Sequence, residues 1–220
     1  MKKREQAPTY YPIFLNISGR RCVVVGGGQV ALRKVKALLE HGANVDIISP
    51  ALCPELTELS RSGKIQVLHR EYREGDLKDA LVTIAATDNS DVNLKLAEDG
   101  RKHTTLVNVV DDANNSDFIA PSYLRCGDVT IAISTGGRSP ALARKIRTRL
   151  EKDFDAEFAS LTQLISEVRD EIKQRGIKVD AEVWQAALDL DLLADLLRRG
   201  DSEQTRAVLL HNLKISQATV

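Results

Sequence analysis

The chain lacks an excess of charge of either sign, because 31 lysine and arginine residues balance 31 aspartate and glutamate residues. This balance argues against a general nucleic-acid-binding protein, a class that is usually strongly basic. The charge is unevenly distributed: residues 151–220 carry a net charge of −5, and residues 1–150 carry +5. The basic first part suits an anionic ligand, although ordinary surface variation would give the same pattern.

Long apolar runs are also absent, and cysteine is scarce. No segment is long enough to cross a bilayer, and the basic residues at positions 2–4 are not followed by the apolar stretch of a secretion signal. Cys22, Cys53 and Cys126 are widely spaced, odd in number and without metal-ligand spacing. We therefore expect a soluble cytoplasmic protein with no membrane or nucleic-acid partner.

Two further absences limit the chemistry. The four histidines show neither i, i+4 pairing nor a nearby carboxylate motif, which favours solvated surface positions, and no metal site is predicted; they are His41, His69, His103 and His211. No tyrosine is followed four residues later by lysine, which excludes the Tyr-x-x-x-Lys pair of some dehydrogenases.

The most informative segment that is present joins an apolar run, a glycine turn and a helical pattern. Residues 22–25 have the composition of a strand buried on both faces, and glycines follow at positions 26–28. From Gln29 onward, apolar residues recur at helical spacing, and Gly42 is the expected end of the helix.

This order of strand, glycine turn and helix gathers backbone N–H groups and a helix N-terminus around one point, as a pyrophosphate site requires. The spacing is Gly26-x-Gly28-x-x-Ala31, the variant with alanine in the third small position. Glycine turns also serve purely structural connections, but the flanking strand and helix favour dinucleotide binding here.

The pattern up to residue 110 alternates strands with helices. A short apolar edge is expected at 13–15, further strands at 45–48, 65–68, 81–86 and 105–110, and helices at 52–62, 76–80 (one turn) and 90–103. This alternation predicts an α/β fold with a Rossmann-type parallel sheet covered on both faces.

The pattern changes after Asp111. A polar connector leads to two strand-like segments, 118–124 and 129–134, whose closeness predicts an antiparallel hairpin. Ser139 as N-cap and Pro140 at the first helical position open a helical remainder, expected at 141–154, 156–174, 181–199 and 202–213. We predict a Rossmann domain at 1–113, a small α+β segment at 114–150 and an all-helical domain at 151–220.

The second strand ends without the acidic residue that often binds the ribose hydroxyls of NAD. Ser49, Pro50 and Ala51 stand there instead. Backbone groups and the Ser49 hydroxyl are the expected ribose contacts, and the choice between NAD and NADP stays open.

Polar residues follow the fourth and fifth strands, at the edge where open α/β sheets bind ligands: Thr87 with its neighbours, and the stretch from Asn108 to Asp112. A carboxylate beside a nicotinamide could accept a proton as hydride leaves, although most such aspartates only cap or solvate a loop. If the strand continues, Asp111 and Asp112 point in opposite directions, and at most one faces the cofactor.

A second candidate anion site precedes the helix that starts at Pro140. Its glycine-rich backbone could turn N–H groups toward carboxylates, and basic residues follow closely at 138, 144, 145, 147 and 149. A basic amphipathic helix with a solvated face explains the same pattern equally well.

Together these residues resemble the precorrin-2 dehydrogenase family of sirohaem biosynthesis, which includes stand-alone enzymes and the N-terminal module of sirohaem synthase. The matching motifs occur in the family's order and cover residues 10 to about 150: YPIF at 11–14, VGGGQVA at 25–31, AATD at 85–88, NVVD at 108–111, FIAPS at 118–122 and STGGRSPALAR at 134–144.

The resemblance implies NAD-dependent oxidation of precorrin-2 to sirohydrochlorin, with Asp111 as the catalytic aspartate and a homodimer built on the segment after the Rossmann domain. With the strand-end arguments, the predicted cofactor-binding residues are Gly26, Gly28, Gln29, Val30, Ser49, Pro50, Ala51, Thr87 and Asn108. The predicted contacts to the polycarboxylate substrate are Ser134, Thr135, Gly136, Gly137 and Arg138.

Two points stay open at the level of sequence. Some relatives also insert ferrous iron into sirohydrochlorin, and nothing in the sequence decides whether this chain does. A non-catalytic NAD-sensing module that regulates a partner is the alternative function, and NADH formation with precorrin-2 would distinguish the two.

Overall fold

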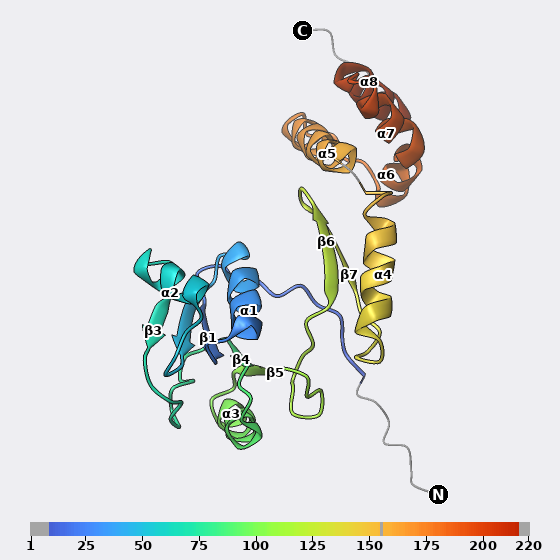
Figure 1. Ribbon diagram of the computed structural model, residues 1–220. Coiled ribbons are helices and arrows are strands. Elements are labelled where there is room, and N and C mark those ends of the chain that lie inside the picture. The colour runs from blue at the N-terminus through green and yellow to red at the C-terminus, as the bar shows by residue number, and fades with distance from the viewer. Residues whose placement is uncertain (1–8, 155, 216–220) are drawn as a thin grey trace, which may run out of the picture. The chain divides into compact units, whose positions relative to one another are not determined.

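The computed structural model describes residues 9–154 and 156–215 and forms two compact units, residues 1–120 and 121–220 (Figure 1). The first unit is the predicted parallel α/β domain, and the second contains the hairpin and the remaining helices. The predicted division of the second unit into an α+β segment and a separate helical domain stays a prediction.

The first unit is built on a five-stranded parallel sheet. Its strands are β1 (Arg21–Val25), β2 (Asn44–Ile48), β3 (Gln66–Leu68), β4 (Val82–Ala85) and β5 (Leu106–Val109), in the order β3-β2-β1-β4-β5. The chain builds outward from β1 to β3 and then returns to place β4 beside β1. Ligands of open α/β sheets bind at this reversal, beyond the carboxyl ends of the strands.

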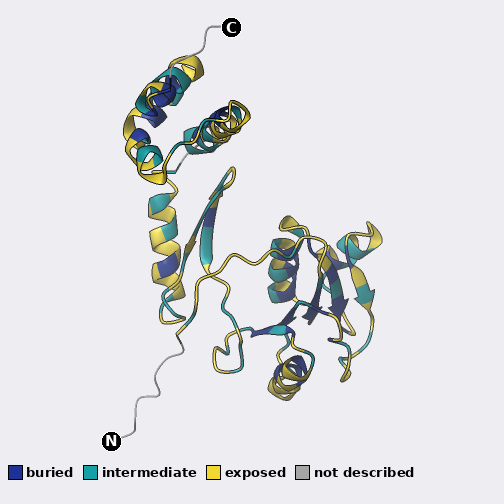
Figure 2. Cartoon of the chain, turned by 180° about the vertical axis from the view of Figure 1, so that it is seen from behind, coloured by how far each residue is buried: buried dark blue, intermediate teal, exposed yellow. Residues whose placement is uncertain are grey.

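Helices cover both faces of this sheet because alternate strand residues point to opposite sides. Cys22 and Val24 of β1 pack in one core with α1 (Gln29–Glu40) and α2 (Pro54–Arg61). Val23 and Val25 pack in a second core with α3 (Ser90–Lys102). The central strands of the sheet are therefore buried on both sides, whereas the edge strand β3 is partly exposed (Figure 2).

The free edge of β5 is closed by side chains from the connector that follows it. The Val107 N–H donates to Asp117 Oδ2 at 2.9 Å, and the Asp117 N–H donates to the Val107 carbonyl at 2.8 Å. The Val109 N–H donates to Ser116 Oγ at 2.9 Å. The loop at 110–115 therefore leaves the end of β5 and returns to the edge of the same strand.

In the second unit, β6 (Ser122–Cys126) and β7 (Val129–Ile133) form the predicted antiparallel hairpin. Helix α4 (Pro140–Leu150) packs on both strands, and the Ser139 hydroxyl caps it by accepting the Leu142 N–H at 3.2 Å, as predicted. A separate helical core joins α5 (Ala156–Gln174), α6 (Ala181–Ala187), α7 (Leu190–Arg198) and α8 (Ser202–Asn212). Among the residues that the structure describes, no helix has the length and apolarity needed to cross a membrane.

The prediction of a helical turn at 76–80 is wrong. This stretch is a series of turns in which Asp79 has a φ of 62°, a left-handed conformation that a right-handed helix excludes. The Arg70 guanidinium donates to both carboxylate oxygens of Asp76 at 2.7 Å, and the Arg73 N–H donates to the same carboxylate at 2.8 Å. Side-chain hydrogen bonds therefore fix this loop in place of helical ones.

Three other expectations need correction. The helix expected at 181–199 is two helices, because the chain leaves helical geometry at Leu188 and Asp189 then caps α7 by accepting the Leu192 N–H. Residues 118–121 are not part of a strand, since β6 begins at Ser122. The apolar residues expected to form a short edge at 13–15 are exposed instead, with Phe14 at 75%.

Gly100 in α3 supplies a test of how this helix packs on β5. A Cβ at Gly100 would lie 2.1 Å from Cγ2 of Val107. Helix propensity alone favours alanine by about 1 kcal/mol, but overpacking of this kind typically costs about 1–3 kcal/mol. We therefore expect Gly100→Ala to lower the melting temperature, measured by circular dichroism.

The matched control is the same substitution in a Val107→Ala background, where the clashing methyl group is absent. Gly100→Ala should destabilise that background less than the wild type. An equal cost in both backgrounds would show that the close approach of α3 to β5 is not responsible.

Candidate active site

The glycine turn at 26–28 leaves β1 at the reversal of strand order. Gly26 has a φ of 126°, and a Cβ there would lie 2.2 Å from the Ala86 carbonyl oxygen, directly after β4. A Cβ on Gly27 would lie 1.8 Å from the Ala51 carbonyl oxygen, in the segment after β2. Only glycine fits at these two positions, because the turn passes between two neighbouring backbone segments.

Gly28 differs from the other two glycines, since no atom lies within 4 Å of the position of its Cβ. It is the N-cap residue of α1, in extended conformation, and no side chain caps this helix end. The first turn of α1 contains no acidic residue. Open space and an uncapped helix N-terminus together suit a bound pyrophosphate.

The segment after β2 packs directly on this turn. The Cys53 N–H donates to the Gly27 carbonyl at 2.8 Å, and the Ser49 hydroxyl donates to the Ala51 carbonyl at 2.7 Å. Pro50 and Ala51 therefore lie beside the glycine turn, where cofactor contacts are predicted. The Ser49 side chain is nearly buried and its proton is used within the protein, so its oxygen can only accept a hydrogen bond.

An acidic residue beside the turn was missed at the level of sequence. Gln29, the first residue of α1, donates from Nε2 to Oε2 of Glu55 in the first turn of α2, at 3.3 Å. The Glu55 backbone N–H lowers the pKa of this exposed carboxyl, and the Gln29 amide adds to the effect. The signal in the sequence is an acid in the first helical turn after β2, whereas the usual rule for NAD-binding domains concerns the end of the strand itself.

The side chains of Thr87 and Asn108 brace the ends of β4 and β5. The Thr87 hydroxyl donates to Oδ1 of Asn93 at 2.7 Å, and the Asn93 amide donates back to the Thr87 carbonyl at 3.0 Å. Asn108 is almost fully buried and donates from Nδ2 to the Phe118 carbonyl at 2.9 Å. Both residues that are predicted to bind the cofactor thus lie toward the carboxyl ends of the strands, with their hydrogen-bond donors used inside the protein.

Asp111 and Asp112 lie in a turn after the end of β5 at Val109, so the strand does not continue and the alternation expected of a continuing strand does not apply to them. The Asp112 N–H donates to the Val109 carbonyl at 3.2 Å, and Asp111 has a left-handed φ of 61°. The Asp112 carboxylate accepts the backbone N–H groups of Asn114 and Asn115 and the Asn115 amide, which lower its pKa. Asp112 is therefore a structural residue of the loop.

The Asp111 carboxylate is exposed, and it makes no hydrogen bond or ion pair within 9–154 and 156–215. Its charge acts on Lys34 in α1. Burial lowers the pKa of Lys34, the positive charge of Arg33 lowers it further, and the negative charge of Asp111 opposes both effects. The Asp111 carboxylate is thus close enough to α1, the helix after the glycine turn, to interact electrostatically with one of its side chains.

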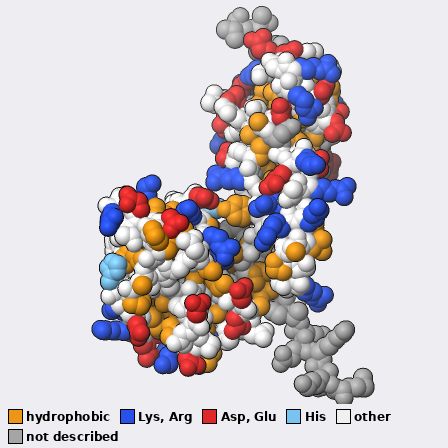
Figure 3. Space-filling model, in the orientation of Figure 1, with side chains coloured by type: hydrophobic (Ala, Val, Ile, Leu, Met, Phe, Trp, Pro, Cys, Tyr) orange, Lys and Arg blue, Asp and Glu red, His pale blue; other side chains and the backbone are white. Residues whose placement is uncertain are grey.

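The predicted substrate residues 134–138 belong to the second unit, whereas the cofactor set and Asp111 belong to the first. Ser134 Oγ accepts the Gly136 N–H at 3.0 Å, and Thr135 Oγ1 accepts the Ser139 N–H at 2.9 Å. Gly136 and Gly137 have φ values of 61° and 78°, and open space lies beside both. Lysine and arginine side chains follow along α4 (Figure 3).

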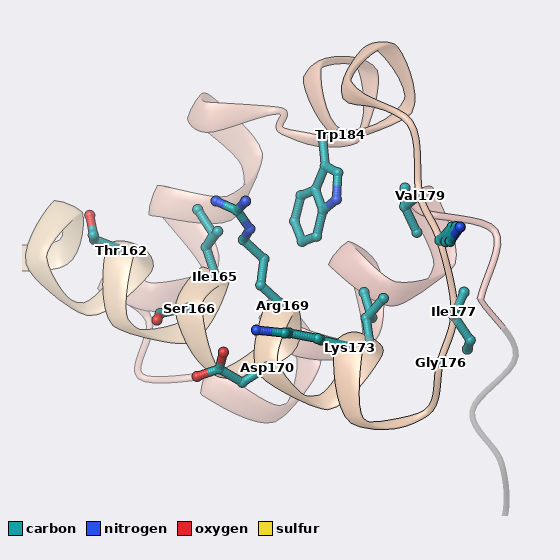
Figure 4. A pocket seen from close by; sticks show the side chains of 12 residues that line it. Thr162, Ile165, Ser166, Arg169, Asp170, Lys173, Gly176, Ile177, Val179 and Trp184 are labelled. Carbon is teal, nitrogen blue, oxygen red and sulfur yellow. The ribbon is translucent and has the colours of Figure 1, made fainter.

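The second unit also contains a cleft that the sequence does not predict. It has a volume of about 780 Å³ and is lined by α5, the loop after it and α6 (Figure 4). The Arg169 guanidinium lies 5.7 Å from the centre of the Trp184 ring. No three His, Cys, Asp or Glu side chains of the described part of the chain are grouped as metal ligands, in this cleft or elsewhere.

Comparison with known proteins agrees with this geometry. A family model described as NAD(P)-binding matches residues 13–122, half of the chain, and a model for the central part of sirohaem biosynthesis proteins matches residues 127–152. The solved structure of SirC, precorrin-2 dehydrogenase, has a TM-score of 0.67 and 25% sequence identity, and the match covers 93% of this chain and 99% of that one.

Curated relatives include siroheme synthases from Chromobacterium violaceum and Nitrosococcus oceani. They are 40% and 39% identical over 200 and 202 residues, which cover 90% and 91% of this chain. The chain spans less than half of their length, 42% and 43%. The glycine turn at the strand reversal, the NAD(P)-binding match and the likeness to SirC agree, and the chain belongs to the precorrin-2 dehydrogenase family.

Proposed function

We propose that this chain catalyses the NAD-dependent oxidation of precorrin-2 to sirohydrochlorin. The likeness to SirC carries this proposal, because it extends over 93% of this chain and 99% of that precorrin-2 dehydrogenase. The siroheme synthases support it over the part that they share with this chain. A cytoplasmic location belongs to the proposal, since the wide spacing of the cysteines suits a reducing compartment.

In this proposal the glycine turn holds the pyrophosphate of NAD, which supplies the hydride acceptor when bound. Support comes from the open space beside Gly28 and from the uncapped N-terminus of α1, where Gln29 and Val30 present their backbone N–H groups. Ala51 lies against the turn, and it and the preceding Pro50 would contact the adenosine part.

Asp111 is the proposed proton acceptor. Oxidation of precorrin-2 by two electrons releases a hydride to the nicotinamide and one proton, which the Asp111 carboxylate would take and pass to water. The support is its place beyond β5, its exposure and its lack of a competing partner in the described residues. Asp112 would not serve, because three hydrogen bonds within the loop occupy its carboxylate.

The substrate carboxylates are proposed to bind at residues 134–138 and along α4. Gly136 and Gly137 leave space on their backbone for an anion, and Arg138 and the basic residues of α4 supply positive charge. A polycarboxylate such as precorrin-2 matches this combination.

We further propose a homodimer formed through the hairpin and α4. A two-stranded sheet leaves two edges for pairing, and α4 exposes the apolar side chains of Leu142 and Ile146 one turn apart, at 52% and 37%. The family resemblance favours a second copy of the chain as the partner that covers these edges and the apolar side chains of α4.

Gly28→Val tests the pyrophosphate site. The Cβ of the branched side chain would enter open space, and the backbone at this position already has an extended conformation that valine accepts. We expect the melting temperature to stay unchanged and the affinity for NAD to fall at least ~10-fold, about 1.4 kcal/mol, in a calorimetric titration.

Gly27→Ala is the contrasting variant, because its Cβ would lie 1.8 Å from the Ala51 carbonyl oxygen. It should lower the melting temperature, unlike Gly28→Val. A folded Gly28→Val protein with wild-type affinity for NAD would rule out the glycine turn as the pyrophosphate site.

Asp111→Asn tests the proposed reaction in an anaerobic assay of NADH formation with enzymatically generated precorrin-2. The wild type should form NADH, and the variant should turn over roughly 10²–10⁴-fold more slowly because it lacks the general base. Asparagine tolerates the left-handed conformation of this position, so the fold should persist. Binding of NAD should be nearly unchanged.

Asp112→Asn is the internal control and should stay active, since an amide oxygen can still accept the N–H groups of Asn114 and Asn115. An essential Asp112 with a dispensable Asp111 would contradict the assignment. Wild-type protein that binds NAD but forms no NADH would contradict the proposed reaction and favour the sensor.

Leu142→Glu tests the proposed dimer. We expect sedimentation equilibrium to show a dimer for the wild type at micromolar concentration and a monomer for the variant, because a buried unpaired carboxylate would oppose association. Leu190→Glu is the matched control, since Leu190 of α7 is similarly exposed, at 48%. A monomeric wild type, or equal effects of both variants, would contradict this interface.

A further inference from the structure

We propose that Glu55 is a specificity-determining residue that makes this protein prefer NAD to NADP. The inference rests on the proposed function and deepens it, because the end of β2 itself offers no group that distinguishes the two cofactors. The discriminating carboxylate comes instead from the first turn of α2.

The position of Glu55 is fixed by the packing of the preceding segment on the glycine turn. The Cys53 N–H donates to the Gly27 carbonyl at 2.8 Å, and Ala51 lies so close to Gly27 that no Cβ fits between them. Helix α2 begins at Pro54, directly after this contact. Its first turn therefore cannot move away from the glycine turn without breaking the hydrogen bond.

The side chain of Glu55 contacts the side chain of Gln29, the first residue of α1. Its Oε2 accepts the Gln29 amide at 3.3 Å, and Gln29 directly follows Gly28 in the chain. The carboxylate is exposed, so a ribose hydroxyl can replace the amide as donor at little cost. The carboxylate lies where a dinucleotide on the glycine turn would pass its adenosine ribose toward the end of β2.

A carboxylate in this place distinguishes the two cofactors by charge and by hydrogen bonding. The ribose of NAD offers two hydroxyl donors, and hydrogen bonds from hydroxyls to an ionised acceptor are short and strong. The 2′-phosphate of NADP removes one donor and adds negative charge, so Glu55 repels it.

The arginine that follows the neighbouring strand, β3, is bound elsewhere and does not offset this repulsion. NADP-binding domains place an arginine near the 2′-phosphate, and Arg70 is the candidate here, since the Ser49 N–H joins the end of β2 to the Leu68 carbonyl at 3.2 Å. Both terminal nitrogens of Arg70 are bound to the carboxylate of Asp76 at 2.7 Å. Of the groups that lower the pKa of Glu55, Lys36 has the smallest effect.

The test is calorimetric titration of NAD and of NADP into the wild type, Glu55→Gln and Glu58→Gln. The wild type should bind NAD at least ~10-fold more tightly than NADP, and Glu55→Gln should reduce that ratio at least ~5-fold. Glutamine keeps the size of the side chain, and an exposed substitution of this kind leaves stability nearly unchanged. Glu58, exposed one turn later on α2, is the control for diffuse charge and should leave the ratio unchanged.

The outcomes separate this inference from the function on which it rests. An unchanged ratio in Glu55→Gln or an equal change in Glu58→Gln would overturn the role of Glu55 and leave the dehydrogenase proposal intact. A wild type that prefers NADP would overturn the role of Glu55 and change the cofactor of the proposed reaction, but not the oxidation of precorrin-2 itself. A wild type that binds neither dinucleotide would overturn both.

Discussion

The close approach of three backbone segments at the glycine turn is the constraint on which the rest of the first unit depends. Gly26 lies against the carbonyl after β4, and Gly27 lies against the carbonyl after β2. The ends of β1, β2 and β4 therefore meet at one point, which brings the N-termini of α1 and α2 together. The lack of a Cβ atom at Gly26 and Gly27 thus allows the approach that determines where a ligand can bind.

The sequence predicts most of the first unit because its elements are marked by local signals. Four apolar residues before three glycines are typical of a short buried strand, and the apolar residues of α1 recur at helical spacing. The failures at 76–80 and 181–199 have a common cause, since polar side chains determine the backbone there. The Arg70–Asp76 pair and the Asp189 cap leave no trace in the spacing of apolar residues.

In the candidate site, too, some residues can be predicted from local sequence motifs and others cannot. Its glycines and Asp111 belong to a motif that can be read from the chain, whereas the uses of Thr87 and Asn108 depend on contacts across 6 and 10 residues. Gln29 and Glu55 are separated by 26 residues, and only the packing of α2 on the glycine turn brings them together. Sequence spacing therefore locates the edge of the sheet where a ligand binds, but not the side chains that reach it.

The closed edge of β5 has a consequence for the behaviour of the protein in concentrated solution. An open edge strand offers a row of unpaired N–H and carbonyl groups to other chains and is a common starting point of aggregation. In this protein, the side chains of Asp117 and Ser116 accept the N–H groups of Val107 and Val109, so these groups are not open to a strand of another chain. The connector after β5 thus blocks this edge of the sheet against pairing with a strand of another molecule.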